Sequence, residues 1–280
     1  MSRCGSPIIL ILSVLTVFIS APAFTEVLTV ESRMAPGPVK IDGRGDEWPP
    51  AGSALDTRAG AELRFQNDGR NLYILLVVKK LEALKSAEAS GMTIFHRPGR
   101  GKKPGSGVLF LAKDVPAEDI IQWRESQGAL LTEGEKAEIR KSARQPLFLA
   151  FAVGAKGSTY GPLVRRQMDT DPPDFVVSTG AGEATYEFRI PLASPESVPG
   201  GIGAEPGQTI RISFDWGGTV RGSLSTKASR EAPSSESGYT SGTGRTWGQE
   251  FLDTFDSMSR PSLGTGKYSF AMDVKLAEIK

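Results

Sequence analysis

Several stretches of the chain alternate apolar and polar residues with a period of two, which is the pattern of a β-strand that buries one face. The longest of these predict strands on their own, at 61–66, 185–190, 209–216 and 267–276. The runs 72–78 and 147–153 are almost continuously apolar, as expected of strands covered on both faces. Frequent glycine and proline, 32 and 19 residues, separate the stretches with turns. The chain is therefore predicted to contain many short strands.

Turn chemistry links some of these strands. Asn67–Arg70 lies between two of them, and Gly69 can take the positive φ of a tight turn, so the pair is predicted to be a hairpin. Val39 and Ile41 alternate ahead of a glycine-broken acidic turn that ends at Trp48. We expect a further strand there, and it is the candidate neighbour for the long final strand.

The segment 81–145 is the least strand-like part of the chain. Helices are predicted at 82–89, at 116–127 and after a capping box at Thr132–Glu135, with a short strand at 108–112. The segment has too few apolar residues for a core of its own, so we interpret it as an insertion. The predicted fold class is all-β: an antiparallel β-sandwich, immunoglobulin or jelly-roll-like, with a partly helical insertion.

Residues 1–23 have the features of a secretory signal peptide. Arg3 precedes a short apolar run, and Ala21-Pro22-Ala23 places small residues at the expected cleavage site. The run is shorter than the roughly 20 residues of a transmembrane helix, so a retained anchor is the less favoured alternative. We expect a secreted or periplasmic protein with no membrane partner after cleavage. It would consist of a lead-in at 24–35 and a single domain over 36–280.

Composition narrows the function classes. The only cysteine, Cys4, lies in the predicted leader, so the processed chain has no disulfide and no thiolate nucleophile. Loss of the leader balances basic and acidic residues, which argues against a nucleic-acid partner. No P-loop, CxxC, HExxH or GxSxG motif occurs, and the single histidine, His96, excludes a multi-histidine zinc site. We predict no catalytic residue and no enzyme activity.

Three segments, in this order, carry a resemblance to a known family. They are Ile41-Asp42-Gly43 followed by Asp46-Glu47-Trp48, then the predicted hairpin with Leu72-Tyr73-Ile74, then Tyr186–Leu192. Together they resemble the family 9 carbohydrate-binding modules and their DOMON-like relatives. The resemblance implies a sandwich of two antiparallel sheets and, in the members that bind glycans, sugar held on aromatic platforms. The segment 81–144 departs from the family pattern.

Sugar recognition needs flat aromatic rings flanked by polar groups. Trp216 ends a predicted strand beside two glycines, and Trp247 follows a stretch, 217–244, that is rich in Gly, Ser and Thr and is predicted to be a long loop. With their neighbours Tyr239 and Arg245, they are the candidate ligand-binding residues. The other tryptophans, Trp48 and Trp123, are expected to be structural.

Acidic residues near the start of the domain suggest a cation. Asp42, Asp46 and Glu47 offer clustered oxygen ligands of the kind that calcium prefers. The alternative is that the aspartates only cap the turn. No other cofactor is predicted.

The basic stretch 96–103 begins with His96 and is expected to be a solvated loop. Its functional alternative is a contact surface for an anionic glycan or phosphate. A second function hypothesis is a DOMON-like electron carrier, with haem held by His96 and a methionine such as Met92 or Met168; the sequence does not favour it. A third is an extracytoplasmic scaffold that binds partners through the segment 81–144. The sequence predicts no oligomeric state.

Overall fold

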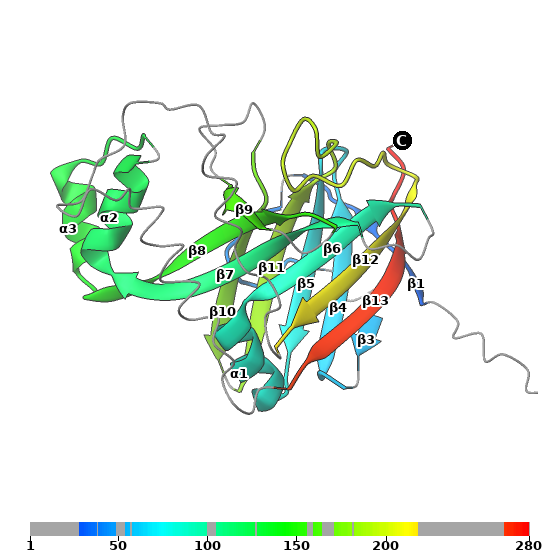
Figure 1. Cartoon of the computed structure of the whole chain (residues 1–280), viewed down its shortest axis with the longest axis horizontal. Helices are drawn as coiled ribbons and strands as arrows, with labels where there is room; N and C mark the ends of the chain where they lie inside the picture. The colour runs from blue at the N-terminus through cyan, green and yellow to red at the C-terminus, as the bar shows by residue number, and fades with distance from the viewer. Residues whose placement is uncertain are drawn as a thin grey trace, which may run out of the picture.

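The structure is a computed structural model that describes residues 28–37, 39–48, 54–56, 58–99, 105–126, 128–155, 159–163, 171–180, 182–217 and 266–279. Two β-sheets face each other across one core (Figure 1). The first has seven strands in the order β1-β13-β12-β6-β7-β8-β9, and the second has the order β10-β11-β5-β4-β2 with β3 beside β4. The predicted all-β sandwich is confirmed.

The seven-stranded sheet contains β1 (Thr29–Glu31), β13 (Tyr268–Lys275), β12 (Thr209–Trp216), β6 (Met92–Pro98), β7 (Ser106–Pro116), β8 (Arg144–Val153) and β9 (Thr159–Pro162). The six-stranded sheet contains β10 (Asp174–Gly180), β11 (Glu183–Pro191), β5 (Asn71–Val78), β4 (Ala61–Asn67), β2 (Arg33–Met34) and β3 (Ala54–Asp56). Pairing is antiparallel except that β1 runs parallel to β13 and β2 runs parallel to β4. The predicted antiparallel sandwich is therefore mixed at these two positions.

The core lies between the sheets and follows the alternation in the sequence. Along β12, Ile210, Ile212 and Phe214 are all fully buried, while the residues between them are partly exposed. Phe188 of β11 meets Phe110 of β7 across the core, with ring centroids 4.9 Å apart. Burying such side chains is the main force that holds the two sheets together.

The N-terminal part of the domain differs from the prediction. Val39 and Ile41 form no strand; they pack on the outer face of the six-stranded sheet. The partners of β13 are instead β12 and β1, and β1 and β2 lie in the segment predicted to be only a lead-in. Such short strands show too little alternation to be recognised, and β1 buries only Val30.

The segment 81–145 is mostly integral to the sandwich, so the interpretation as an insertion is wrong for its middle part. Its strands β6 and β7 are interior strands of the seven-stranded sheet. The predicted helices are confirmed as α1 (Leu81–Ser90), α2 (Ala117–Ser126) and α3 (Glu133–Arg140). The capping box between Thr132 and Glu135 is present at the start of α3. Helix α1 packs against the core between the sheets, whereas the helical hairpin α2–α3 lies outside that core.

The hairpin α2–α3 covers the outer face of β7 and β8 (Figure 1). A second apolar cluster forms there, and it contains Leu109, Leu111, Val115, Ala117, Ile120, Ile121, Ile139, Leu147, Leu149, Phe151 and Val153. Because β7 and β8 are covered on both faces, they are apolar on both faces. The segment was predicted to have too few apolar residues for a core of its own. The apolar cluster forms nevertheless, because the outer faces of β7 and β8 supply many of its residues.

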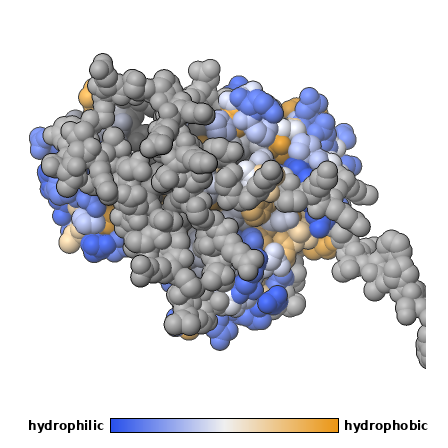
Figure 2. Space-filling model, viewed as in Figure 1, coloured by the Kyte–Doolittle hydropathy of each residue, from blue (hydrophilic) through white to orange (hydrophobic). Residues whose placement is uncertain are grey.

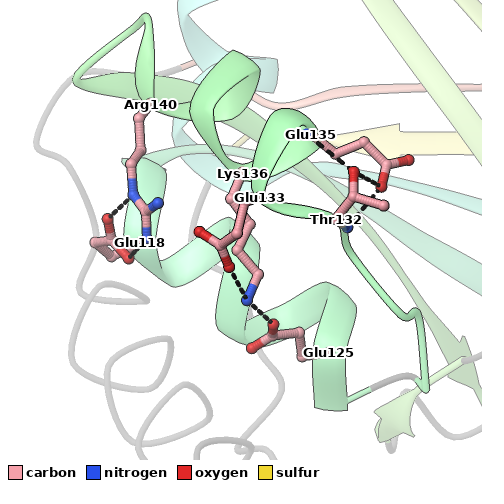
Figure 3. Close-up of polar contacts among 7 residues, drawn as sticks. All are labelled: Glu118, Glu125, Thr132, Glu133, Glu135, Lys136 and Arg140. Atoms are coloured by element: carbon pink, nitrogen blue, oxygen red, sulfur yellow. Dashed lines mark hydrogen bonds and ion pairs between the residues drawn. The ribbon is translucent and has the colours of Figure 1, made fainter.

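Polar contacts join the two helices at the surface (Figure 3). Arg140 Nε donates to Glu118 at 2.6 Å, and Lys136 Nζ lies 2.8 Å from Glu125. Exposed pairs of this kind contribute little because water screens their charges, so the apolar cluster beneath holds the hairpin in place. Hydrophilic residues predominate among the coloured atoms at this end of the molecule in Figure 2.

Removing the hairpin α2–α3 should expose the apolar residues of β7 and β8 that it covers. Pro116 and Arg144 face each other across β7 and β8, so a tight Asn-Gly turn in place of residues 117–143 keeps the strand pairing. We expect the shortened protein to aggregate, as measured by the soluble fraction and by size-exclusion chromatography. The matched control carries Leu149→Thr and Phe151→Thr on the same shortened chain and should recover soluble protein. A shortened protein that stays as soluble as the full chain would contradict this role.

None of the helices in the described parts of the chain is long and apolar enough to span a bilayer. Residues 1–23, the predicted leader, lie outside the described residues.

Candidate binding face

The acidic turn and the strand β11 meet at one buried carboxylate. Glu187 is fully buried on the outer side of β11. Its Oε2 accepts hydrogen bonds from the backbone N–H groups of Asp42, at 2.9 Å, and Gly43, at 2.8 Å. Its Oε1 accepts one from Trp48 Nε1 at 2.7 Å. Burial raises the pKa of the Glu187 carboxyl, and these donors act against that rise.

The three segments that carry the family resemblance meet around this carboxylate. Trp48 packs against Tyr73 and Leu75 of β5, and β5 pairs with β11 so that Leu75 lies directly opposite Glu187. The motif residues therefore anchor the N-terminal segment to the outer face of the six-stranded sheet. The structural role expected for Trp48 is confirmed, since its side chain is buried.

The structure does not bring Asp42, Asp46 and Glu47 together as a metal site. Asp42 instead accepts a hydrogen bond from the backbone N–H of Arg44 at 3.1 Å and pairs with Lys40 at 2.8 Å, so it shapes the turn. Asp46 and Glu47 are exposed. Within the described residues, no group of three or more His, Cys, Asp or Glu side chains converges as a metal site would require.

The structure also corrects the interpretation of Trp216. Its side chain is 2% exposed and points into the core in the same phase as Phe214. The indole Nε1 donates to the carbonyl of Ala83 at 3.0 Å, and the ring stacks on Tyr268 with centroids 5.4 Å apart. It is therefore a core residue and not a sugar platform. The other ligand-binding candidates, Tyr239, Arg245 and Trp247, lie outside the described residues and stay predictions.

His96 lies in the core and not in a solvated loop. Strand β6 continues to Pro98, and Met92, Ile94 and His96 alternate inward along it. The imidazole is 1% exposed, and neither ring nitrogen has a hydrogen-bond partner among the described residues. Burial lowers the pKa of His96 to about 4, and the nearby backbone of Gly200 opposes this only in part.

The outer side of β6, β12 and β13 carries mostly polar side chains, and we call it the binding face. Its residues are those that alternate with the core residues of the same strands: Thr93, Phe95, Arg97, Thr209, Arg211, Ser213, Asp215, Ser269, Ala271, Asp273 and Lys275. Strand register arranges them in rows. Arg97, Arg211 and Asp273 form one row, and Phe95 and Ser213 lie in the next.

Phe95 is the aromatic residue of the binding face. It lies opposite Gly107 on β7, and a Cβ atom on that glycine would come within 3.0 Å of Phe95 Cδ1. The missing side chain lets the ring lie across to β7, against the edge of the cluster under α2 and α3. Sequence reasoning missed Phe95, although Thr93, Phe95 and Arg97 alternate with apolar residues. The strand was not recognised, because the basic stretch after it is interrupted by glycine and proline.

Two buried polar atoms of the binding face have no hydrogen-bond partner among the described residues. Asp215 Oδ2 lies 3.5 Å from Lys267 Nζ, but Oδ1 of the same carboxylate is buried without a hydrogen bond in the described residues. Burial raises the pKa of the Asp215 carboxyl, against the effect of Lys267. Arg97 Nη2 is likewise buried and without a partner there. Buried polar atoms are normally hydrogen-bonded, so these atoms retain capacity for a ligand.

A hollow of about 630 Å³ lies at the adjacent ends of β6 and β12. It is lined by Pro98, Gly99, Gln208 and Thr209. A Cβ atom on Gly99 would meet nothing within 4 Å, so the space above this glycine is open. The hollow therefore continues the binding face beyond Arg97 and Arg211.

No family model matches the chain, and no curated protein matches it. Among solved structures, it is similar to a family 9 carbohydrate-binding module from Caldicellulosiruptor kristjanssonii in complex with glucose. That match has 12% identity and a TM-score of 0.35, and it covers 90% of this chain and 97% of the other. A structure of such a module from the same organism with cellotriose matches with 11% identity and a TM-score of 0.33, covering 90% and 94%.

Both structures belong to the family that the three sequence segments resemble. The sandwich is established by its own strand pairing.

Proposed function

We propose that this chain is a non-catalytic carbohydrate-binding domain that holds glycan on its binding face. The observation that supports this most is the composition of that face, where an aromatic ring lies among hydrogen-bonding groups with unused capacity. Sugars present C–H groups to aromatic rings and hydroxyl groups to carboxylates, guanidinium groups and hydroxyls. Phe95, Asp215 and Ser213 offer these partners on neighbouring strands.

The proposal includes Trp247, Tyr239 and Arg245 as further ligand contacts. Their support is compositional: two aromatic residues and a guanidinium lie in and just after a stretch rich in Gly, Ser and Thr. It also includes export to the periplasm or the medium, supported by the features of residues 1–23. Expression in a secreting host followed by N-terminal sequencing tests cleavage after Ala23, and a mature chain that still begins at Met1 would contradict export.

Affinity electrophoresis through gels that contain soluble cellulose derivatives, xylan or pectin tests glycan binding. We expect retardation in at least one gel. Phe95→Ala and Asp215→Asn should each weaken binding by at least tenfold, about 1.4 kcal/mol, since each removes a direct contact. Leu130→Ala, which changes a 97% exposed residue on the far hairpin, is the control and should bind like the wild type. Trp247→Ala tests the platform prediction in the same gels. No retardation in any gel would overturn the proposed function.

A further inference from the structure

We propose that Arg97 and Arg211 bind the acidic group of an anionic glycan, the carboxylate of a uronate or a sulfate ester. This inference rests on the proposed function, because it names the glycan class that the binding face would take. The site lies on the outer side of β6 and β12, at the edge of the hollow beside Gly99.

The first observation is the register of the two strands. Arg97 and Arg211 are directly opposite each other, and both alternate with core residues, so two guanidinium groups share one side of the sheet. Like charges directly opposite each other on neighbouring strands are destabilising. An anion between them would remove this repulsion.

The second observation is that, among the residues that the structure describes, only one of the two arginines has an acidic partner. Arg211 Nη1 lies 3.0 Å from Asp273 Oδ1, and this aspartate is almost buried. Arg97 forms no ion pair with any residue that the structure describes, and its Nη2 is buried without a hydrogen-bond partner there. Counted over the described residues, the row of Arg97, Arg211 and Asp273 has two positive charges and one negative charge, which matches a ligand with one acidic group.

The third observation is the space around the pair. In the next row, Thr209 lies opposite the exposed Lys275, and Gly99 leaves an open hollow beside Thr209. On the other side of Arg97 along β6 lies Phe95. An acidic sugar bound there would have the ring of Phe95 on one side and the two guanidinium groups on the other. Guanidinium groups bind carboxylate and sulfate oxygens in a bidentate manner.

The test compares matched charged and neutral polysaccharides in affinity gels. Polygalacturonate is paired with its fully methyl-esterified form, and dextran sulfate is paired with dextran, so the two pairs separate a carboxylate from a sulfate. We expect the wild type to be retarded at least tenfold more strongly by one charged polymer than by its neutral partner, and Arg97→Gln to lose that difference. Arg33→Gln is the control, since it removes the same charge from the exposed strand β2 and should behave like the wild type.

A second measurement guards against a folding defect. Because Arg97→Gln relieves a like-charge pair, the ligand-free variant should unfold at the same urea concentration as the wild type or at a higher one. Arg211→Gln leaves Asp273 without this partner, so the second variant combines Arg211→Gln with Asp273→Asn. It should also lose the preference for the charged polymer. Equal retardation by charged and neutral polymers, unchanged in both variants, would overturn the acidic site and leave glycan binding intact.

A titration with sodium sulfate, followed through the arginine Nε–H signals in NMR, separates this inference from the proposed function. Sulfate-dependent shifts that disappear in Arg97→Gln support the anion site even if no polysaccharide is bound. If sulfate shifts no arginine signal and no charged polymer is preferred, the inference is wrong.

Discussion

Replacing Glu187 with glutamine should lower the free energy of unfolding by about 3 kcal/mol, since hydrogen bonds to a buried carboxylate contribute roughly 1.5–3 kcal/mol each and orphaned donors add a penalty. Both oxygens of Glu187 accept hydrogen bonds, from two backbone N–H groups on one side and from the Trp48 indole on the other. A glutamine has only one acceptor oxygen, so its NH₂ group must face one of these donors. The N-terminal segment would then lose part of its anchor.

Urea unfolding followed by tryptophan fluorescence and by circular dichroism measures this change. Glu183→Gln is the matched control, because the residue lies on the same strand and the same side of the sheet but is only half-buried. We expect its effect to stay below about 0.5 kcal/mol. Trp48→Phe removes one of the donors, so combining it with Glu187→Gln should cost less than the sum of the two single changes. A Glu187→Gln protein as stable as the control would show that the carboxylate does not anchor the turn.

The second large effect is a dependence of stability on pH through His96. In the unfolded chain its pKa is near 6.5, and in the folded protein burial lowers the pKa to about 4. Between these values the unfolded state binds the proton and the folded state does not. The contribution of neutral His96 is therefore fully present above pH 6.5 and is lost as the pH falls toward 4. Integrated over that window, the loss is about 3 kcal/mol.

Asp174, Asp215 and Glu187 also have raised pKa values because of burial, and these carboxyls act in the opposite direction on acidification. The test therefore compares the wild type with His96→Leu at each pH. We expect the difference in unfolding free energy between the two proteins to grow by about 3 kcal/mol from pH 7 to pH 4 in favour of the variant. A constant difference across this range would contradict a buried neutral imidazole.

Since His96 is the only histidine, NMR can also follow its titration directly without assignment. The ring signals of the folded protein should remain those of a neutral imidazole down to about pH 5. A midpoint near pH 6.5 would place the ring in contact with solvent.

The local pattern of residues in the sequence was sufficient to predict most strands and helices of the fold. The alternation at β11, β12 and β13 predicted these strands, because each has one face on the core and the side-chain period of a strand is two. The capping box at Thr132 predicted the start of α3, because both of its hydrogen bonds lie within four consecutive residues. The turn after Asn67 predicted the β4–β5 hairpin for the same reason, as all its contacts are local.

The candidate site was predicted less well, because its residues depend on which side of a strand faces the core. Trp216 and Phe95 are both aromatic residues in strands, yet one is buried under α1 and the other lies on the outer face. Their strands pair only through contacts between segments far apart in the sequence, and β6 was hidden by the basic stretch that follows it. The positions of Tyr239, Arg245 and Trp247 remain predictions from the sequence.

By itself, the sequence determined that the chain consists mainly of short strands with a few short helices, because strand and helix periods, caps and turns are local properties. Only the tertiary structure decided what the acidic turn does. Asp42 and Glu187 are 145 residues apart, and the hydrogen bond between them exists only once β11 and the turn are brought together. The tertiary structure likewise placed Arg97 opposite Arg211, because the register between distant strands is set by packing across the whole core.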